Sequence, residues 1–156
     1  MSRMSAGVAL AVIIVLGVAA AAYAQYHQQQ GPPAGAGAAP SANLKQQITT
    51  ATTHAGFAAE GTSMAYVQQH LGHALNCLEG ARGKNFNQSW GNVCEGQGNG
   101  ILVDLRSAPD GATFRAVAGA ADELALGGVK SKELNEAKVV AKGTAALLKV
   151  IGDNLK

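Results

Sequence analysis

Small apolar residues recur at helical spacing in four segments between residues 43 and 156, and this periodicity restricts the fold more than any other feature. Each segment begins next to a residue that caps helices: Ser41 or Asn43, Thr62 or Ser63, Asp110, and Ser131. In chain order the predicted inward stripes are Leu44, Ile48, Ala51, Ala55 and Ala58; Met64, Val67, Leu71, Ala74, Leu75 and Leu78; Phe114, Val117, Ala121 and Leu124; and Leu134, Ala137, Ala141, Leu148, Ile151 and Leu155. The sequence therefore predicts four amphipathic helices.

The connections between these segments indicate how the helices pack. The first two helices meet at Gly61-Thr62, and Gly127-Gly128 ends the third helix just before Ser131, so both pairs have short turns. A long stretch dense in glycine and asparagine, residues 80–107, separates the pairs. We therefore expect an all-α domain over residues 43–156: an antiparallel four-helix bundle made of two helical hairpins joined by one long loop.

The predicted core contains few large side chains. Aromatic residues make up 4% of the chain, and alanine is its commonest residue. Helices with such small side chains must approach closely to bury enough apolar area. Each predicted helix also contains a glycine, which costs about 1 kcal/mol relative to alanine. These glycines indicate either close backbone contacts or a ligand pressed against the helices: Gly56, Gly72, Gly119 and Gly143.

The first 24 residues have the pattern of an export signal. Arg3 precedes an uncharged apolar segment at residues 6–22, and Ala22-Tyr23-Ala24 is a small-x-small cleavage pattern. The alternative is a retained membrane anchor over residues 5–24, because about 20 uncharged residues can span a bilayer. Both interpretations place the rest of the chain outside the cytoplasm, as a periplasmic or secreted protein or one anchored to the inner membrane.

Residues 25–42 consist mainly of glutamine, glycine, proline and alanine, a composition that cannot bury apolar surface. We expect a disordered linker there. His27 lies in this linker and would be the third residue if cleavage left Gln25 at the amino terminus. That arrangement can hold Cu(II) in a square plane. The other interpretation is an isolated histidine in a spacer.

Charge and motifs disfavour two classes of function. The formal net charge is only +2, with no long run of lysine and arginine and no aromatic residues between basic ones, so we expect no nucleic-acid partner. No acid/base pair or activated nucleophile is recognisable, so we expect no enzyme. Contact with a membrane is expected only through residues 5–24, if they are retained.

Cys77 lies near the end of the second predicted helix, and Cys94 lies in the long loop. Outside the cytoplasm two cysteines favour a disulfide, which here would close about 17 residues and contribute about 3 kcal/mol. Two alternatives are a thiolate metal ligand at Cys77, four residues after His73, and a nucleophilic Cys77, which lacks an orienting acid. In the same loop we expect Phe86 and Trp90 to cover the open end of the bundle, with a ligand platform as the alternative.

Three histidines are predicted to meet across the first hairpin. His54 and His70 lie about equally far from the turn at Gly61-Thr62, so they should be level with each other. His73 is three residues beyond His70, the spacing that places side chains next to each other on a helix. Tyr66 and Cys77 share that flank. The alternative is that these histidines are boundary residues satisfied by water or backbone carbonyls.

Together these patterns predict an exported helical-bundle protein that binds a transition metal ion (Cu, Zn, Ni or Fe) through His54, His70 and His73. One alternative is a structural or interaction module of the cell envelope without a cofactor. The other is a haem-binding bundle, although the chain has no Cys-x-x-Cys-His attachment motif.

Overall fold

The computed structural model describes residues 42–156, and all regular structure in this range is helical. The predicted signal or anchor segment, His27, and the predicted linker except Ala42 lie outside these residues. The four long helices are α2 (Ala42–Glu60), α3 (Met64–Glu79), α5 (Gly111–Lys130) and α6 (Leu134–Asn154). Three short helices lie between α3 and α5, namely η1 (Gln88–Trp90), α4 (Ile101–Asp104) and η2 (Leu105–Ser107).

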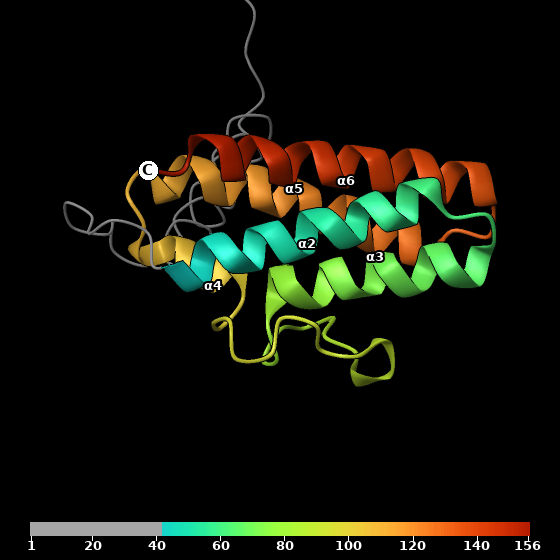
Figure 1. The fold of residues 1–156 in the computed structure, drawn as a ribbon, viewed down its shortest axis with the longest axis horizontal. Coiled ribbons are helices and arrows are strands. Elements are labelled where there is room, and N and C mark those ends of the chain that lie inside the picture. Colours follow the sequence, from blue (N-terminus) through green and yellow to red (C-terminus); the bar gives the residue numbers. More distant parts are fainter. Residues whose placement is uncertain (1–41) are drawn as a thin grey trace, which may run out of the picture. The chain divides into compact units, whose positions relative to one another are not determined.

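The long helices run side by side and pack as a bundle (Figure 1). α2 packs against α3 and α6, and α5 packs against the same two helices. Short connections at residues 61–63 and 131–133 join α2 to α3 and α5 to α6, as predicted. The loop that follows α3 lies outside the bundle beside α3 (Figure 1). The expectation of an all-helical bundle is therefore confirmed for the described part of the chain.

The core consists of small and medium aliphatic side chains. The predicted stripe of α2 is buried along its whole length, from Leu44 to Ala58, and so is that of α3 beyond Met64. The stripe of α6 is buried from Ala137 to Leu155. Four buried polar residues were not predicted: Gln47, Asn76, Glu79 and Thr144.

The predicted face of α5 is correct for Ala121, which is buried, and for Phe114 and Val117, which pack against the core, but wrong for Leu124. Its buried side chains are Ala118, Ala121 and Ala125, whereas Leu124 is 36% exposed. The alanines allow α5 to approach α3 and α6 closely, so the helix turns its smallest residues inward. Gly128 does not end the helix either. It is buried, and a Cβ atom there would collide with Leu71 of α3, so this glycine permits a close helix contact.

The helix caps follow the sequence in part. Ser63 caps α3 by accepting a hydrogen bond from the backbone N–H of Tyr66 at 3.3 Å. Asp110 stands at the start of α5, but its side chain makes no capping bond. The residue that precedes α6 is Glu133, and Ser131 instead ends α5.

Among residues 42–156, no helix combines the length and the hydropathy that crossing a bilayer requires.

Candidate metal centre

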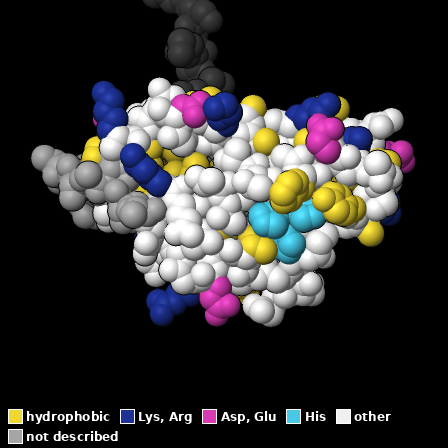
Figure 2. Space-filling model, viewed as in Figure 1, with side chains coloured by type: hydrophobic (Ala, Val, Ile, Leu, Met, Phe, Trp, Pro, Cys, Tyr) yellow, Lys and Arg dark blue, Asp and Glu magenta, His cyan; other side chains and the backbone are white. Residues whose placement is uncertain are grey.

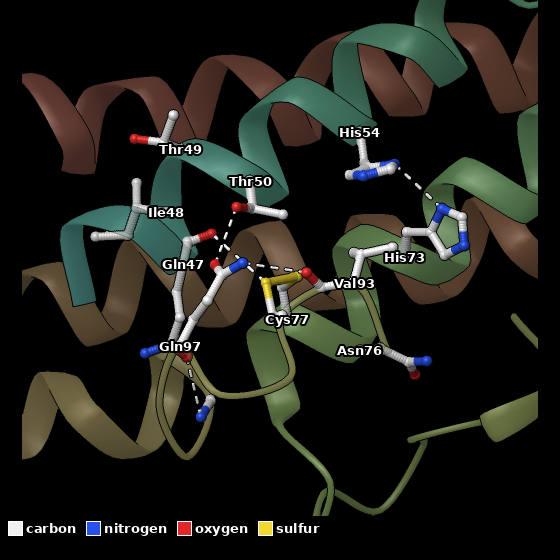
Figure 3. The surroundings of a disulfide bond; sticks show 12 residues. Gln47, Ile48, Thr49, Thr50, His54, His73, Asn76, Cys77, Val93 and Gln97 are labelled. Atoms are coloured by element: carbon white, nitrogen blue, oxygen red, sulfur yellow. Dashed lines mark hydrogen bonds between the residues drawn. A yellow bond between two sulfur atoms is a disulfide. The ribbon is translucent and has the colours of Figure 1, made fainter. Parts of the chain in front are cut away.

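Cys77 and Cys94 form a disulfide with a Cα–Cα distance of 5.4 Å (Figure 3). Both residues are buried, and residues 42–156 contain no free cysteine. The predicted pairing is therefore confirmed. Because both sulfur atoms are bonded to each other, neither is available as a thiolate ligand or as a nucleophile.

The disulfide-linked loop is fastened along α3. The indole of Trp90 packs against Gly72, where any Cβ atom would collide with the ring. The buried Asn76 donates hydrogen bonds to the carbonyls of Asn87 at 2.9 Å and Gly91 at 2.8 Å. The expectation that Trp90 covers the end of the bundle is therefore wrong. Because Gly72 has no side chain, the indole of Trp90 can pack against the side of α3. Asn76 donates the hydrogen bonds that hold the loop there.

Three half-buried histidines meet beside this loop, and Figure 2 shows them together on one face of the molecule. Nδ1 of His54 on α2 lies 2.9 Å from Nδ1 of His70 and 3.1 Å from Nδ1 of His73, both on α3. Figure 3 shows the side chains of His54 and His73 pointing toward each other. His54 and His70 therefore lie opposite each other across the hairpin, as predicted, with His73 beside them.

The spacing of these nitrogens suits a metal ion. One potential ligand atom from each histidine lies within 4.8 Å of the others. A tetrahedral ion bound to imidazoles at about 2.0–2.1 Å holds its nitrogen ligands roughly 3.3 Å apart. The two Nδ1 separations from His54 are slightly shorter than this, so a small rotation of the rings would admit an ion.

Two groups fix His73 from outside the cluster. Gln69, one turn earlier on α3, places its Nε2 atom 3.1 Å from Nε2 of His73 and donates a hydrogen bond to the carbonyl of Trp90 at 2.6 Å. Gly91 lies over the same edge of the imidazole. These contacts lie on the Nε2 side of His73 and leave Nδ1 facing the other histidines. A metal ion on Nδ1 requires the proton to be on Nε2, and the backbone of Trp90 is the group that can accept it.

Sequence reasoning missed the role of Gln69, although its spacing of four residues from His73 was a usable signal. Nothing in the sequence indicated that the carbonyl of Trp90 would reach this site. The contact depends on how the loop folds back on α3.

Two aromatic rings border the other side of the cluster. The ring centroid of Phe57 lies 5.7 Å from that of His54 and 5.3 Å from that of His70. The ring of Tyr66 lies 4.3 Å from that of His70. Phe57 and Tyr66 remain 46% and 45% exposed, so the cluster is bordered by aromatic surface and open to solvent there.

The histidines are held in their neutral form. Burial, and after it the positive charges that His73 and His70 would carry, lower the pKa of His54 to about 4. Burial and the proximity of His73 also lower the pKa of His70. Burial lowers the pKa of His73, against the opposing effect of its hydrogen bond with the backbone of Trp90. Neutral imidazoles are the form that binds metal ions.

Within the described residues no carboxylate joins the histidine cluster. Asp122 on α5 and Glu136 on α6 do not belong to the cluster. Asp122 lies close enough to Glu79 and Glu123 for their charges to raise its pKa. Glu136 accepts a hydrogen bond from the hydroxyl of Ser131 at 2.6 Å. The donor set is therefore three imidazoles.

Comparisons of the chain with protein-family models, with curated proteins and with solved structures find no match. The chemistry of the histidine cluster is consequently the strongest indication of function.

Proposed function

We propose that this protein binds a transition metal ion through His54, His70 and His73, outside the cytoplasm. The observation that carries the proposal is the convergence of three Nδ1 atoms. A neutral imidazole nitrogen has either one proton or one lone pair. Nδ1 of His54 therefore cannot make two good hydrogen bonds to the two neighbouring Nδ1 atoms. A cation at the centre would satisfy all three lone pairs at once.

The donor set favours ions that accept imidazole, which are Zn, Cu, Ni and Fe. Calcium and magnesium prefer oxygen ligands, and no carboxylate belongs to the cluster. The geometry also favours an ion over haem. Two axial histidines bind haem iron from opposite faces of the macrocycle, whereas here the nitrogens lie within hydrogen-bond distance of each other.

Two features support a location outside the cytoplasm. The first is the Cys77–Cys94 disulfide, because disulfides form and persist in oxidising compartments. The apolar segment after Arg3 has the pattern of an export signal or anchor. In such a compartment the protein would hold or transfer a metal ion.

Calorimetric titration of the purified protein with Zn(II) tests the proposal. We expect one ion per chain with a dissociation constant below about 10 μM. Replacing His54, His70 or His73 singly by alanine should weaken binding by about 100-fold or more, because even outer-shell changes cost 10- to 100-fold. His27→Ala is the matched control and should leave Zn(II) affinity unchanged. Binding that survives in the His54→Ala/His70→Ala variant would refute the site.

A further inference from the structure

The histidine cluster supplies fewer ligands than the proposed ions accept. Zinc in proteins is almost always four-coordinate, and sites with three protein ligands keep the fourth position for water or substrate. In the described part of the chain the cluster has three ligands, and both cysteines are bound in the disulfide. An ion held there would have a coordination position left for a molecule from outside.

The surroundings of the cluster indicate from which side that molecule would enter. On the loop side, Gln69 and Gly91 cover His73. On the opposite side, the exposed rings of Phe57 and Tyr66 border His54 and His70. Figure 2 shows the histidines reaching the surface beside hydrophobic side chains.

A pocket lies beside these two rings, next to the turn between α2 and α3, and no histidine lines it. It has a volume of about 220 Å³ and is lined by Phe57, Tyr66 and the chain between α2 and α3, from Glu60 to Ser63. This volume is large enough for a small organic molecule. The two rings that contact the histidines therefore also form walls of a small, open pocket.

We propose that the metal-loaded site binds a small planar monoanion, with its donor atom on the metal and its apolar body between Phe57 and Tyr66. This inference rests on the metal site proposed above. Three neutral imidazoles leave the full charge of a divalent ion uncompensated, which favours an anionic donor. The aromatic walls favour a flat apolar body. Glu60 in the pocket lining disfavours a second negative charge.

Visible spectroscopy of the full chain loaded with Co(II) tests the open position. A spectrum that requires His54, His70 and His73 establishes the loaded site. Azide added to it should then change the spectrum in a saturable way. If Co(II) does not bind through the histidines, the metal site itself fails. If Co(II) binds but azide leaves the spectrum unchanged, the metal site stands and the open position is refuted.

His27 provides an internal check, because it is the other histidine of the chain. We expect azide to bind the wild type and the His27→Ala variant equally. Azide binding that appears only after His27→Ala would show that the chain fills the fourth position itself, which contradicts the inference.

Benzoate and acetate test the aromatic pocket, since both offer one carboxylate and only benzoate has a ring. The concentration that gives half of the change in the Co(II) spectrum should be about two- to tenfold lower for benzoate than for acetate. Phe57→Ala and Tyr66→Ala should remove this preference. Val139→Ala, an exposed apolar residue on α6, should keep it. Equal affinities for the two acids in the wild type would refute the pocket.

Discussion

The indole of Trp90 packs directly on Gly72, one residue before His73 on α3. The next loop residue, Gly91, faces the imidazole of His73. The carbonyl of Trp90 also accepts a hydrogen bond from Gln69, which contacts His73 as well. The loop and the histidine cluster are therefore joined at one place.

Substituting Gly72 by alanine tests that connection. The added methyl group collides with the Trp90 ring and should displace the loop, lowering the free energy of unfolding by about 1–3 kcal/mol. Zn(II) affinity should fall as well, because Trp90 and Gln69 hold His73. The matched control is Gly119→Ala, where a Cβ atom meets nothing within 4 Å and stability should rise by up to about 1 kcal/mol. Equal effects of the two substitutions in urea unfolding would contradict this account.

Removing the disulfide tests the same connection from the other end of the loop. The Cys77→Ala/Cys94→Ala variant should lose about 3 kcal/mol of stability, since the bridge closes 17 residues. It should also bind Zn(II) more weakly when titrated at a temperature at which it remains folded. An unchanged affinity in the folded variant would mean that the loop does not position His73.

The fold and the site were predictable to different extents. The stripes of α2 and α3 were readable because each contains leucine, isoleucine or valine at helical spacing. The predicted face of α5 was wrong at Leu124 because alanines and larger residues alternate around the helix, and hydropathy alone ranks Leu124 above Ala125. Ala125 is the buried residue because a smaller side chain lets the helix axes come closer.

The histidine cluster was predictable because it depends on one short turn. Equal distances from that turn place His54 opposite His70, and helical periodicity then places His73 beside them. The position of Trp90 was not predictable in this way. It depends on a loop without periodicity, whose course is set by the disulfide and by hydrogen bonds to Asn76.

Asp122 gives a prediction about stability at neutral pH. Its Oδ1 atom is buried without a hydrogen-bond partner, and burial, Glu79 and Glu123 raise the pKa of this carboxyl to about 7. Between the ordinary pKa of 3.8 and about 7, the folded protein holds a proton that the unfolded chain releases, so stability falls as pH rises. Asp122→Asn should therefore raise the melting temperature at pH 8 and change it little at pH 4. A lower melting temperature of this variant at pH 8 would contradict the prediction.

His54 should impose the opposite pH dependence on the metal-free protein. Its pKa is about 4 when folded and near 6.5 when unfolded, so in this interval the unfolded chain binds a proton that the folded protein does not. Stability should thus rise from pH 4 to pH 6.5 and level off above it. Denaturant unfolding with a chelator present measures this best in the Asp122→Asn variant, which lacks the opposing contribution. The pKa values of His70 and His73 are lowered too, so His54→Gln should reduce this slope without abolishing it, and an unchanged slope would contradict the prediction.

In the proposed site one ion binds to three imidazoles and to no sulfur. X-ray absorption spectroscopy of the Zn(II)-loaded protein measures this directly. We expect three imidazole nitrogens at about 2.0–2.1 Å from the zinc ion and one further light atom among its direct ligands. A zinc–sulfur distance of about 2.3 Å, or a shell of oxygen ligands with fewer than two imidazoles, would contradict it.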